Sequence, residues 1–424
     1  MIFRRVAGSR SATNTLASFG ISALTRASSF AVTLVIARYL SREAFGAYVL
    51  AVSVAEVLRA LTDFGVDQTV VRGLARGSAS EVAVASAVLI KLLTGCIMVI
   101  AIAVIGRVAV DGNTTQCVQL AYVASTLAAL SRTVTAPVQS DLRSLRIVPA
   151  AASGVVCRVG LVGGALLNGM DLRGVLAASA IAEAVALGIT YVTVSRLRPA
   201  HMAAGVRRVW PLLREAAPLG ALSVLALLYF RIDTILLSLL AGQSAVAEYG
   251  AVYRTSEALL MIATAIASTS LPTLSAAFTR SRAAATSVYQ HYLRVSAAIT
   301  AAAAGVGLVA PGTLMGLLYG DKYRDTGPFL TLMLLSAVVM GINVIQATAL
   351  IALDGQWLIA RVAVLNLVVN VAVNVLLIPR LGVMGACIST LLTEVINSLV
   401  QFALLSRHIG LRSALGWGRL AWGT

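Results

Sequence analysis

The sequence predicts an all-α polytopic membrane protein, with about twelve transmembrane helices in two six-helix lobes and both termini in the cytoplasm. Two observations predict this class. The 424 residues are 59% hydrophobic and 12% charged, with a mean hydropathy of +0.90, and a water-soluble core of this length could not hide so much apolar surface. Apolar runs of about 20 residues, the length that crosses a bilayer core, also recur along the chain.

The apolar runs give twelve candidate spans, separated by short polar or glycine- and proline-containing links. No link is long enough to fold as a soluble domain. The first run follows a basic N-terminal segment but is too long for the apolar core of a signal peptide, so we expect it to remain as the first helix. The expected spans are residues 16–37, 45–62, 82–105, 117–138, 147–168, 173–194, 217–240, 247–275, 292–318, 328–352, 357–378 and 383–405.

Basic residues in the short links set the expected orientation of the spans. With the N-terminus in the cytoplasm, most of the loop arginines fall on the cytoplasmic side. The longest cytoplasmic link divides the chain into two halves of six helices, which is a design typical of transporters. We therefore expect an N-terminal lobe at residues 1–200, a cytoplasmic basic linker at 201–216, a C-terminal lobe at 217–405 and a cytoplasmic tail at 406–424.

The formal net charge of +16 would suggest nucleic-acid binding in a soluble chain. In a membrane protein the same arginines belong in loops, at interfaces and within the spans, so we expect no nucleic-acid partner. The four cysteines are scattered, with no CxxC pair and no histidine at the spacing of metal ligands. We therefore expect no structural metal and no cofactor, apart from Na⁺ or H⁺ as a coupling ion.

Ionisable residues within the spans are the most informative feature of the sequence. A charged side chain at the centre of the bilayer costs about 3 kcal/mol, so each one must face a water-filled cavity or a partner. Glu56, Arg59 and Asp63 share one helix face at i, i+3, i+7, and Arg254 and Glu257 share a face at i, i+3. One interpretation is that these are structural ion pairs that lock helices together, and this alternative stays open.

Cations without a carboxylate on their own helix are harder to explain as structural pairs. Arg26, Lys91 and Arg158 are of this kind. A water-filled cavity with a positive lining suits an anionic substrate such as a phosphate or a pyrophosphate. The candidate substrate-binding cations are Arg26, Arg59, Arg254, Lys91 and Arg158, and the candidate acidic partners in the cavity are Glu56, Glu257 and Glu394.

A second polar group is expected in the outer half of the membrane. Asn366, Asn370 and Asn374 recur at i, i+4, i+8 and form a stripe on one face of an apolar helix. Amide stripes often serve only to join helices, which is the alternative interpretation. Estimated depth places Asp233, Asn370, Asn374 and Thr390 at similar levels, and carboxylate, carbonyl and hydroxyl oxygens suit a hard cation such as sodium. These four residues are therefore a candidate coupling-ion site.

Short motifs follow one another along nearly the whole chain. They are Ile36–Leu40, Phe45–Tyr48, Leu61–Val66, Tyr229–Asp233, Tyr249–Arg254, Leu271–Ser275, Leu318–Tyr323, Asn370–Asn374, Ile378–Ala386 and Thr393–Glu394. Each motif is short, but their order along the chain is specific. The chain resembles the oligosaccharide flippases of polysaccharide biosynthesis, in the multidrug/oligosaccharidyl-lipid/polysaccharide exporter superfamily.

This resemblance implies a two-lobed, V-shaped exporter that moves a polyprenyl-diphosphate-linked oligosaccharide to the outer leaflet by alternating access. It implies that Arg26, Arg59 and Arg254 meet the diphosphate, and that the candidate coupling-ion site binds sodium. The chain departs from the family pattern because asparagines, with no second aspartate, occupy the eleventh span. The implied setting is a bacterial cytoplasmic membrane, with membrane lipids around the chain and a polysaccharide polymerase and glycosyltransferases of the same pathway as partners.

Two other functions compete with a flippase. One is a small-molecule exporter of the same superfamily working as an ion-coupled antiporter, although a cationic lining disfavours cationic drugs. The other is a membrane polysaccharide polymerase or glycosyltransferase. The chain has no DxD motif and only short outer links, so we do not expect an enzyme.

Overall fold

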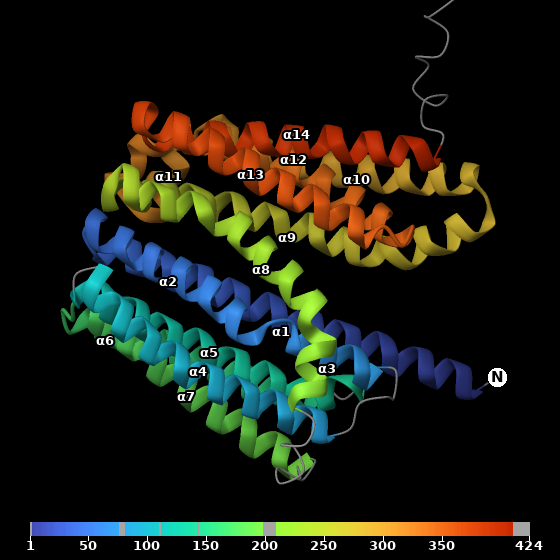
Figure 1. Cartoon of the computed structure of the whole chain (residues 1–424), viewed down its shortest axis with the longest axis horizontal. Coiled ribbons are helices and arrows are strands. Elements are labelled where there is room, and N and C mark those ends of the chain that lie inside the picture. The colour runs from blue at the N-terminus through green and yellow to red at the C-terminus, as the bar shows by residue number, and fades with distance from the viewer. Residues whose placement is uncertain (1, 76–80, 110–111, 142–143, 198–208, 410–424) are drawn as a thin grey trace, which may run out of the picture. The chain divides into compact units, whose positions relative to one another are not determined.

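The computed structural model describes residues 2–75, 81–109, 112–141, 144–197 and 209–409. Within these ranges all regular secondary structure is helical, with long α-helices joined by short turns and short 3-10 helices (Figure 1). The predicted all-α class is confirmed. The chain divides into two compact units, Met1–Arg231 (unit 1) and Ile232–Thr424 (unit 2).

Unit 1 contains the helices coloured blue to green in Figure 1 and the first part of α8. Within it α5 packs against α2, α4 and α7, and α6 packs against α1 and α7. Its helices are α1 (Ile2–Tyr39), α2 (Arg42–Asp63), α3 (Val66–Ala75), α4 (Glu81–Ala109), α5 (Gly112–Ser140), η1 (Ser144–Ile147), α6 (Val148–Leu167), α7 (Leu172–Leu197) and α8 (Val209–Leu240), which continues into unit 2.

Unit 2 contains the end of α8 and the helices that follow it, coloured yellow to red in Figure 1. Here α12 packs against α9, α10 and α14, and α13 packs against α14. The helices are α9 (Gly242–Arg280), α10 (Arg282–Val309), α11 (Pro311–Tyr319), η3 (Asp321–Thr326), α12 (Gly327–Ala352), α13 (Gln356–Leu381) and α14 (Val383–Ile409).

A long helix lies at each of the twelve predicted spans, and within the described ranges eleven helical segments are apolar and long enough to cross a membrane. The remaining long helix is α5, which is rich in threonine, serine and glutamine. The predicted ninth span, 292–318, is wrong in its bounds. Ser281 caps α10 by accepting a hydrogen bond from the Ala284 amide, and the helix ends before Ala310, where Pro311 starts the separate helix α11.

The short helix α3 was not predicted, and a sharp turn between α2 and α3 makes it. Phe64 ends α2 in the left-handed region with a φ of 38°, and Gly65 follows with a φ of +77°. Two consecutive residues are thus left-handed, and glycine is favoured at position 65 because it adopts this backbone without the cost that a side chain adds. The same turn is in close backbone contact with Gly220 of α8, since a Cβ on Gly65 would lie 2.5 Å from the Gly220 nitrogen.

This contact, together with an apolar cluster, attaches the first part of α8 to unit 1. Leu212 and Ala216 of α8 are buried against Val66 and Val70 of α3 and Ile90 of α4. The division between the units therefore falls inside α8 rather than before it. Of the predicted linker 201–216, residues 201–208 lie outside the described ranges, and the rest opens α8. Of the predicted tail 406–424, residues 410–424 also lie outside them.

We expect Gly65→Ala to destabilise unit 1, because the left-handed backbone costs an alanine about 1–2 kcal/mol and the new methyl group collides with α8. A matched control is Gly163→Ala in α6, where a Cβ meets no atom within 4 Å and alanine favours the helix by up to about 1 kcal/mol. Unfolding of the two purified variants in detergent measures the difference. Equal stability of both variants would contradict the role given to the turn.

Candidate functional site

The cation Lys91 lies in a buried ion cluster of unit 1. Its side chain is 2% exposed, and its Nζ lies 2.8 Å from Asp63 Oδ1 and 2.6 Å from Asp67 Oδ1. It donates to Thr133 Oγ1 over 2.7 Å, and that hydroxyl donates to Asp67 Oδ1 over 2.6 Å. The cluster thus joins α2, α3, α4 and α5. Although Lys91 has no carboxylate on its own helix, two carboxylates of neighbouring helices balance its charge.

Arg158 and Glu56 also have partners on other helices of unit 1. Arg158 lies 3.5 Å from Glu183 Oε1 of α7 and donates to Ser29 Oγ of α1 over 3.0 Å. The predicted cavity acid Glu56 pairs with Arg231 of α8, whose Nε lies 2.6 Å from Glu56 Oε2. The pair links α2 to α8 across 175 positions of sequence. These contacts between helices agree with the alternative interpretation given above, that the charges form structural ion pairs.

A second set of cations in unit 1 forms no ion pair with any residue that the structure describes. Arg26 of α1 is exposed and Arg59 of α2 is partly buried. Arg132 of α5, which sequence reasoning missed, is also exposed. It lies within electrostatic range of Arg59 and of the carboxylates around Lys91. Its position inside the predicted span 117–138 was the signal that could have identified it.

The candidate pair in unit 2 is formed within one helix. Arg254 donates to Glu257 Oε2 over 2.9 Å, and the two side chains are 29% and 35% exposed. This is the i, i+3 arrangement that the spacing predicts. Arg254 therefore lies on α9 with its charge balanced locally, unlike Arg26 and Arg59.

The four residues of the candidate coupling-ion site come together in unit 2 at the side chain of Asp233, which is 4% exposed. Asn374 donates to Asp233 Oδ1 over 2.5 Å and to Asn370 Oδ1 over 2.9 Å. Thr390 donates to Asp233 Oδ2 over 3.1 Å. Sequence reasoning missed Tyr249, whose hydroxyl donates to the same oxygen over 2.7 Å. Tyr249 belongs to the Tyr249–Arg254 motif noted above. It lies as far from the start of α9 as Asp233 lies from the end of α8.

The stripe of asparagines is only partly used in this site. Asn366, the third member, is buried and its Oδ1 has no hydrogen-bond partner. The predicted acid Glu394 lies lower on α14 and accepts a hydrogen bond from Asn343 Nδ2 of α12 over 2.7 Å. Glu394 therefore contacts an amide of unit 2. The sequence analysis expected it to be an acidic partner of the substrate-binding cations.

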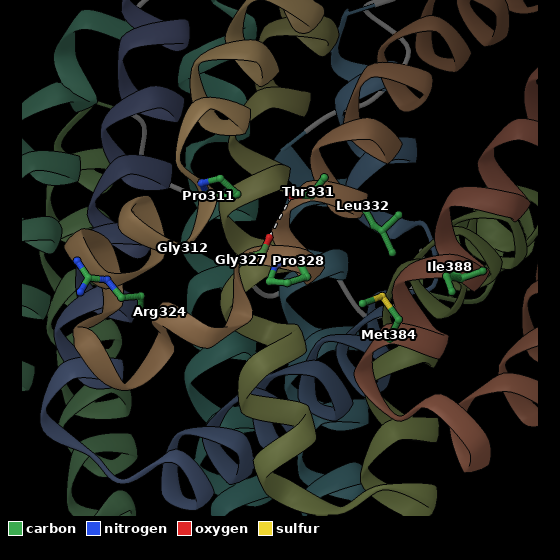
Figure 2. Close-up of a pocket in the computed structure, with 9 residues that line it drawn as sticks. All are labelled: Pro311, Gly312, Arg324, Gly327, Pro328, Thr331, Leu332, Met384 and Ile388. Carbon is green, nitrogen blue, oxygen red and sulfur yellow. Dashed lines mark hydrogen bonds between the residues drawn. The ribbon is translucent and has the colours of Figure 1, made fainter.

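Unit 2 also has an open pocket of about 690 Å³ beside α11, η3, α12 and α14. Figure 2 shows Arg324 on one side of it and Met384 and Ile388 of α14 on the other. A hydrogen bond of 3.2 Å from Thr331 to the Gly327 carbonyl is part of its wall. None of the candidate site residues lines this pocket, and most of its lining is apolar.

Breaking the cluster around Lys91 should be costly. In Lys91→Met the carboxylates of Asp63 and Asp67 lose their buried partner, so we expect a loss of about 3–5 kcal/mol in the free energy of unfolding. Arg173→Gln is the control, because its pair with Asp171 is about half exposed and contributes at most about 1 kcal/mol. Denaturant titration in mixed micelles measures both. Unchanged stability with lost transport in Lys91→Met would favour a substrate-binding role instead.

Comparison with known proteins gives a consistent set of relatives. A family model described as "Polysaccharide biosynthesis protein" matches residues 11–278. The chain is 22% identical over 393 residues to the probable low-salt glycan biosynthesis flippase Agl15 of Haloferax volcanii, covering 90% of this chain and 81% of that protein. It is 30% identical over 186 residues to the probable flippase AglR of the same organism, covering 43% of this chain and 39% of that protein.

Solved structures share the fold at low sequence identity. The lipid II flippase MurJ in an inward closed conformation matches with a TM-score of 0.74 and 12% identity, over 93% of this chain and 87% of that chain. An inward-facing multidrug resistance transporter of the MATE family matches with a TM-score of 0.71 and 14% identity, over 91% of this chain and 95% of that chain. The fold is therefore that of the multidrug and lipid-flippase exporters.

Proposed function

We propose that this chain, which belongs to the polysaccharide biosynthesis protein family, is a flippase that moves a polyprenyl-diphosphate-linked oligosaccharide across a membrane by alternating access. It is a multi-pass membrane protein of the exporter fold. Its relatives Agl15 and AglR are named as probable flippases. An anionic diphosphate substrate explains why long helices of this transporter carry cations.

The observation that carries the proposal is the set of cations without an ion pair in the described part of unit 1. Arg26, Arg59 and Arg132 lie on three long helices, and Arg59 and Arg132 are close enough to repel each other. Neighbouring like charges repel each other, and an anion between them removes this repulsion. A diphosphate offers two negative groups, and arginine binds such oxygens with two parallel hydrogen bonds. We assign Arg26, Arg59 and Arg132 to the diphosphate.

The remaining predicted cations have a weaker claim. Lys91 and Arg158 have carboxylate partners on other helices, and Arg254 has one on its own helix. An arginine that already shares its charge with a carboxylate attracts a diphosphate less strongly. We keep Arg254 as a secondary contact because its pair is partly exposed.

We expect Arg59→Gln and Arg132→Gln each to lower flipping of a diphosphate-linked lipid at least tenfold at low substrate concentration. Each loses charge-assisted hydrogen bonds worth about 1.5–3 kcal/mol. Arg361→Gln on α13 is the matched control, because this arginine lies near a helix start in unit 2 and is not among the proposed diphosphate contacts. The assay follows a labelled lipid diphosphate in proteoliposomes with equal protein content. Wild-type rates in both variants would exclude the assignment.

We further propose that transport is coupled to a cation at Asp233. Asp233, Asn370, Asn374, Thr390 and Tyr249 bring carboxylate, amide and hydroxyl oxygens together in a buried site. The Oδ1 of Asn374 is buried without a hydrogen-bond partner. Turning this amide over exchanges its nitrogen and oxygen, so that Asn374 faces Asp233 as an oxygen ligand. Sodium suits such a set of oxygens.

Three substitutions test the coupling ion and distinguish sodium from a proton. Asp233→Asn should remove the ion dependence in either case, because it removes the only carboxylate that these contacts share. Asn374→Leu and Thr390→Val should abolish only dependence on sodium, since a proton needs the carboxylate but not the other oxygens. Asn366→Leu, on the same stripe, is the control. Transport is measured against Na⁺ gradients and pH gradients separately, and persistence of Na⁺ dependence in Asp233→Asn would contradict the proposal.

A small-molecule antiporter of the same superfamily is the second candidate, because the MATE transporter shares the fold. The unpaired arginines argue against a cationic drug as substrate. A deletion strain separates the two functions. Lipid-linked glycan accumulates in the cytoplasmic leaflet if the chain is a flippase, whereas sensitivity to drugs alone indicates an antiporter.

We also propose the membrane in which the chain works and the enzymes that act with it. We place the chain in a cytoplasmic membrane, where lipid-linked glycans are assembled, with glycosyltransferases and a polysaccharide polymerase acting before and after it. The sequence-based expectation is a bacterial membrane, and the two relatives come from an archaeon. The proposal is for a transporter rather than an enzyme.

A further inference from the structure

A second group of buried polar residues in unit 2 lies where α12 packs against α14. Glu394, Asn397 and Gln401 are three and four residues apart and therefore share one face of α14. Asn343 and Gln346 are three apart on α12. All five side chains are buried. Neither the proposed diphosphate contacts nor the Asp233 site uses them.

The carboxylate of Glu394 is surrounded by amides from both helices. Asn343 Nδ2 donates to Glu394 Oε2 over 2.7 Å and to the Glu394 backbone carbonyl over 2.9 Å. Asn397 Nδ2 lies 3.5 Å from the same Oε2, and Gln401 Nε2 donates to Asn397 Oδ1 over 2.6 Å. The hydrogen bonds thus run as a chain from Asn343 through Glu394 and Asn397 to Gln401.

In these contacts the amides donate through their N–H groups. Several of their carbonyl oxygens accept no hydrogen bond. Asn343 Oδ1, Gln346 Oε1 and Gln401 Oε1 are buried and have no hydrogen-bond partner, on side chains that are 4%, 3% and 5% exposed. A buried polar atom without a partner destabilises the folded chain. The hydrogen bonds between α12 and α14 therefore leave three buried carbonyl oxygens of this group without a donor.

We propose that Glu394 and the amide oxygens around it bind a monovalent cation such as Na⁺, at a second site in unit 2 beside that of Asp233. Carboxylate and carbonyl oxygens are the ligands that hard cations prefer. A single carboxylate balances a single positive charge, which favours Na⁺ over a divalent ion.

The two sites are neighbours along α14. Thr390, a partner of Asp233, lies four residues before Glu394, and a rise of about 1.5 Å per residue separates the two positions by about 6 Å along the helix axis. A cation bound at Glu394 is therefore one helical turn from the oxygens of the Asp233 site. The inference concerns cation binding alone and does not depend on the nature of the transported substrate.

The test counts Na⁺ bound to the full chain, purified in detergent, by equilibrium binding of radioactive Na⁺. We expect two ions per wild-type chain, and one ion each in Glu394→Gln and Asp233→Asn. Glu394→Gln keeps the size of the side chain and one acceptor oxygen for the Asn343 amide, and it removes the charge. Asn366→Leu on α13 is the control, because it removes a buried amide oxygen of the same kind and should leave both ions in place.

The outcomes separate this inference from the coupling proposal. One ion in the wild type that is lost in Glu394→Gln and kept in Asp233→Asn supports the second site and contradicts the first. One ion that is lost in Asp233→Asn and kept in Glu394→Gln overturns the second site alone. Absence of bound Na⁺ from the wild type overturns both.

A gain-of-charge variant tests the site even where Glu394→Gln unfolds. Asn343→Asp places a second carboxylate beside Glu394, so a cation site should become divalent in preference. We expect Ca²⁺ to raise the unfolding temperature of Asn343→Asp and to leave that of the wild type unchanged. If the group only joins helices, the added charge lowers the unfolding temperature and Ca²⁺ does not restore it, which would overturn the proposal.

Discussion

The structure depends on one constraint, which is that water does not solvate charged side chains inside a bilayer. Lipid tails are as apolar as leucine, so apolar contact alone does not choose which helices pack together. Polar groups do, because each one is costly unless it finds a partner. Lys91 of α4 binds two aspartates of α2 and α3 and a threonine of α5, and so holds these four helices together. Glu56 joins α2 to α8 through its ion pair with Arg231.

The two units meet this constraint with different chemistry. Unit 1 uses opposite charges, and its described part still holds arginines that form no ion pair, such as Arg59 and Arg132. Unit 2 binds the carboxylates of Asp233 and Glu394 with hydroxyls and neutral amides. An excess of positive charge suits an anionic head group, whereas an excess of oxygens suits a cation. The division of labour proposed between substrate and coupling ion follows from this contrast.

The candidate site could be predicted in part, and the limits have physical causes. Asn370 and Asn374 share a helix face by spacing alone, and depth along each helix brought Asp233 and Thr390 to the same level, as the contacts show. Depth does not give rotation about the helix axis, so the partners of Lys91 and Arg158 on other helices could not be predicted. Arg132 was overlooked although it lies inside the predicted span 117–138, the same signal that marked Arg26, Lys91 and Arg158.

The sequence by itself determined the class, the number of long helices and their approximate bounds, because hydropathy and length are local properties of the chain. It also predicted family membership, through motifs in a fixed order. Only the tertiary structure decided which charges are neutralised and where the two units divide. Both depend on contacts between distant segments, such as Glu56 with Arg231 and Gly65 with Gly220. No pattern of neighbouring residues encodes the side of a helix that another helix will cover.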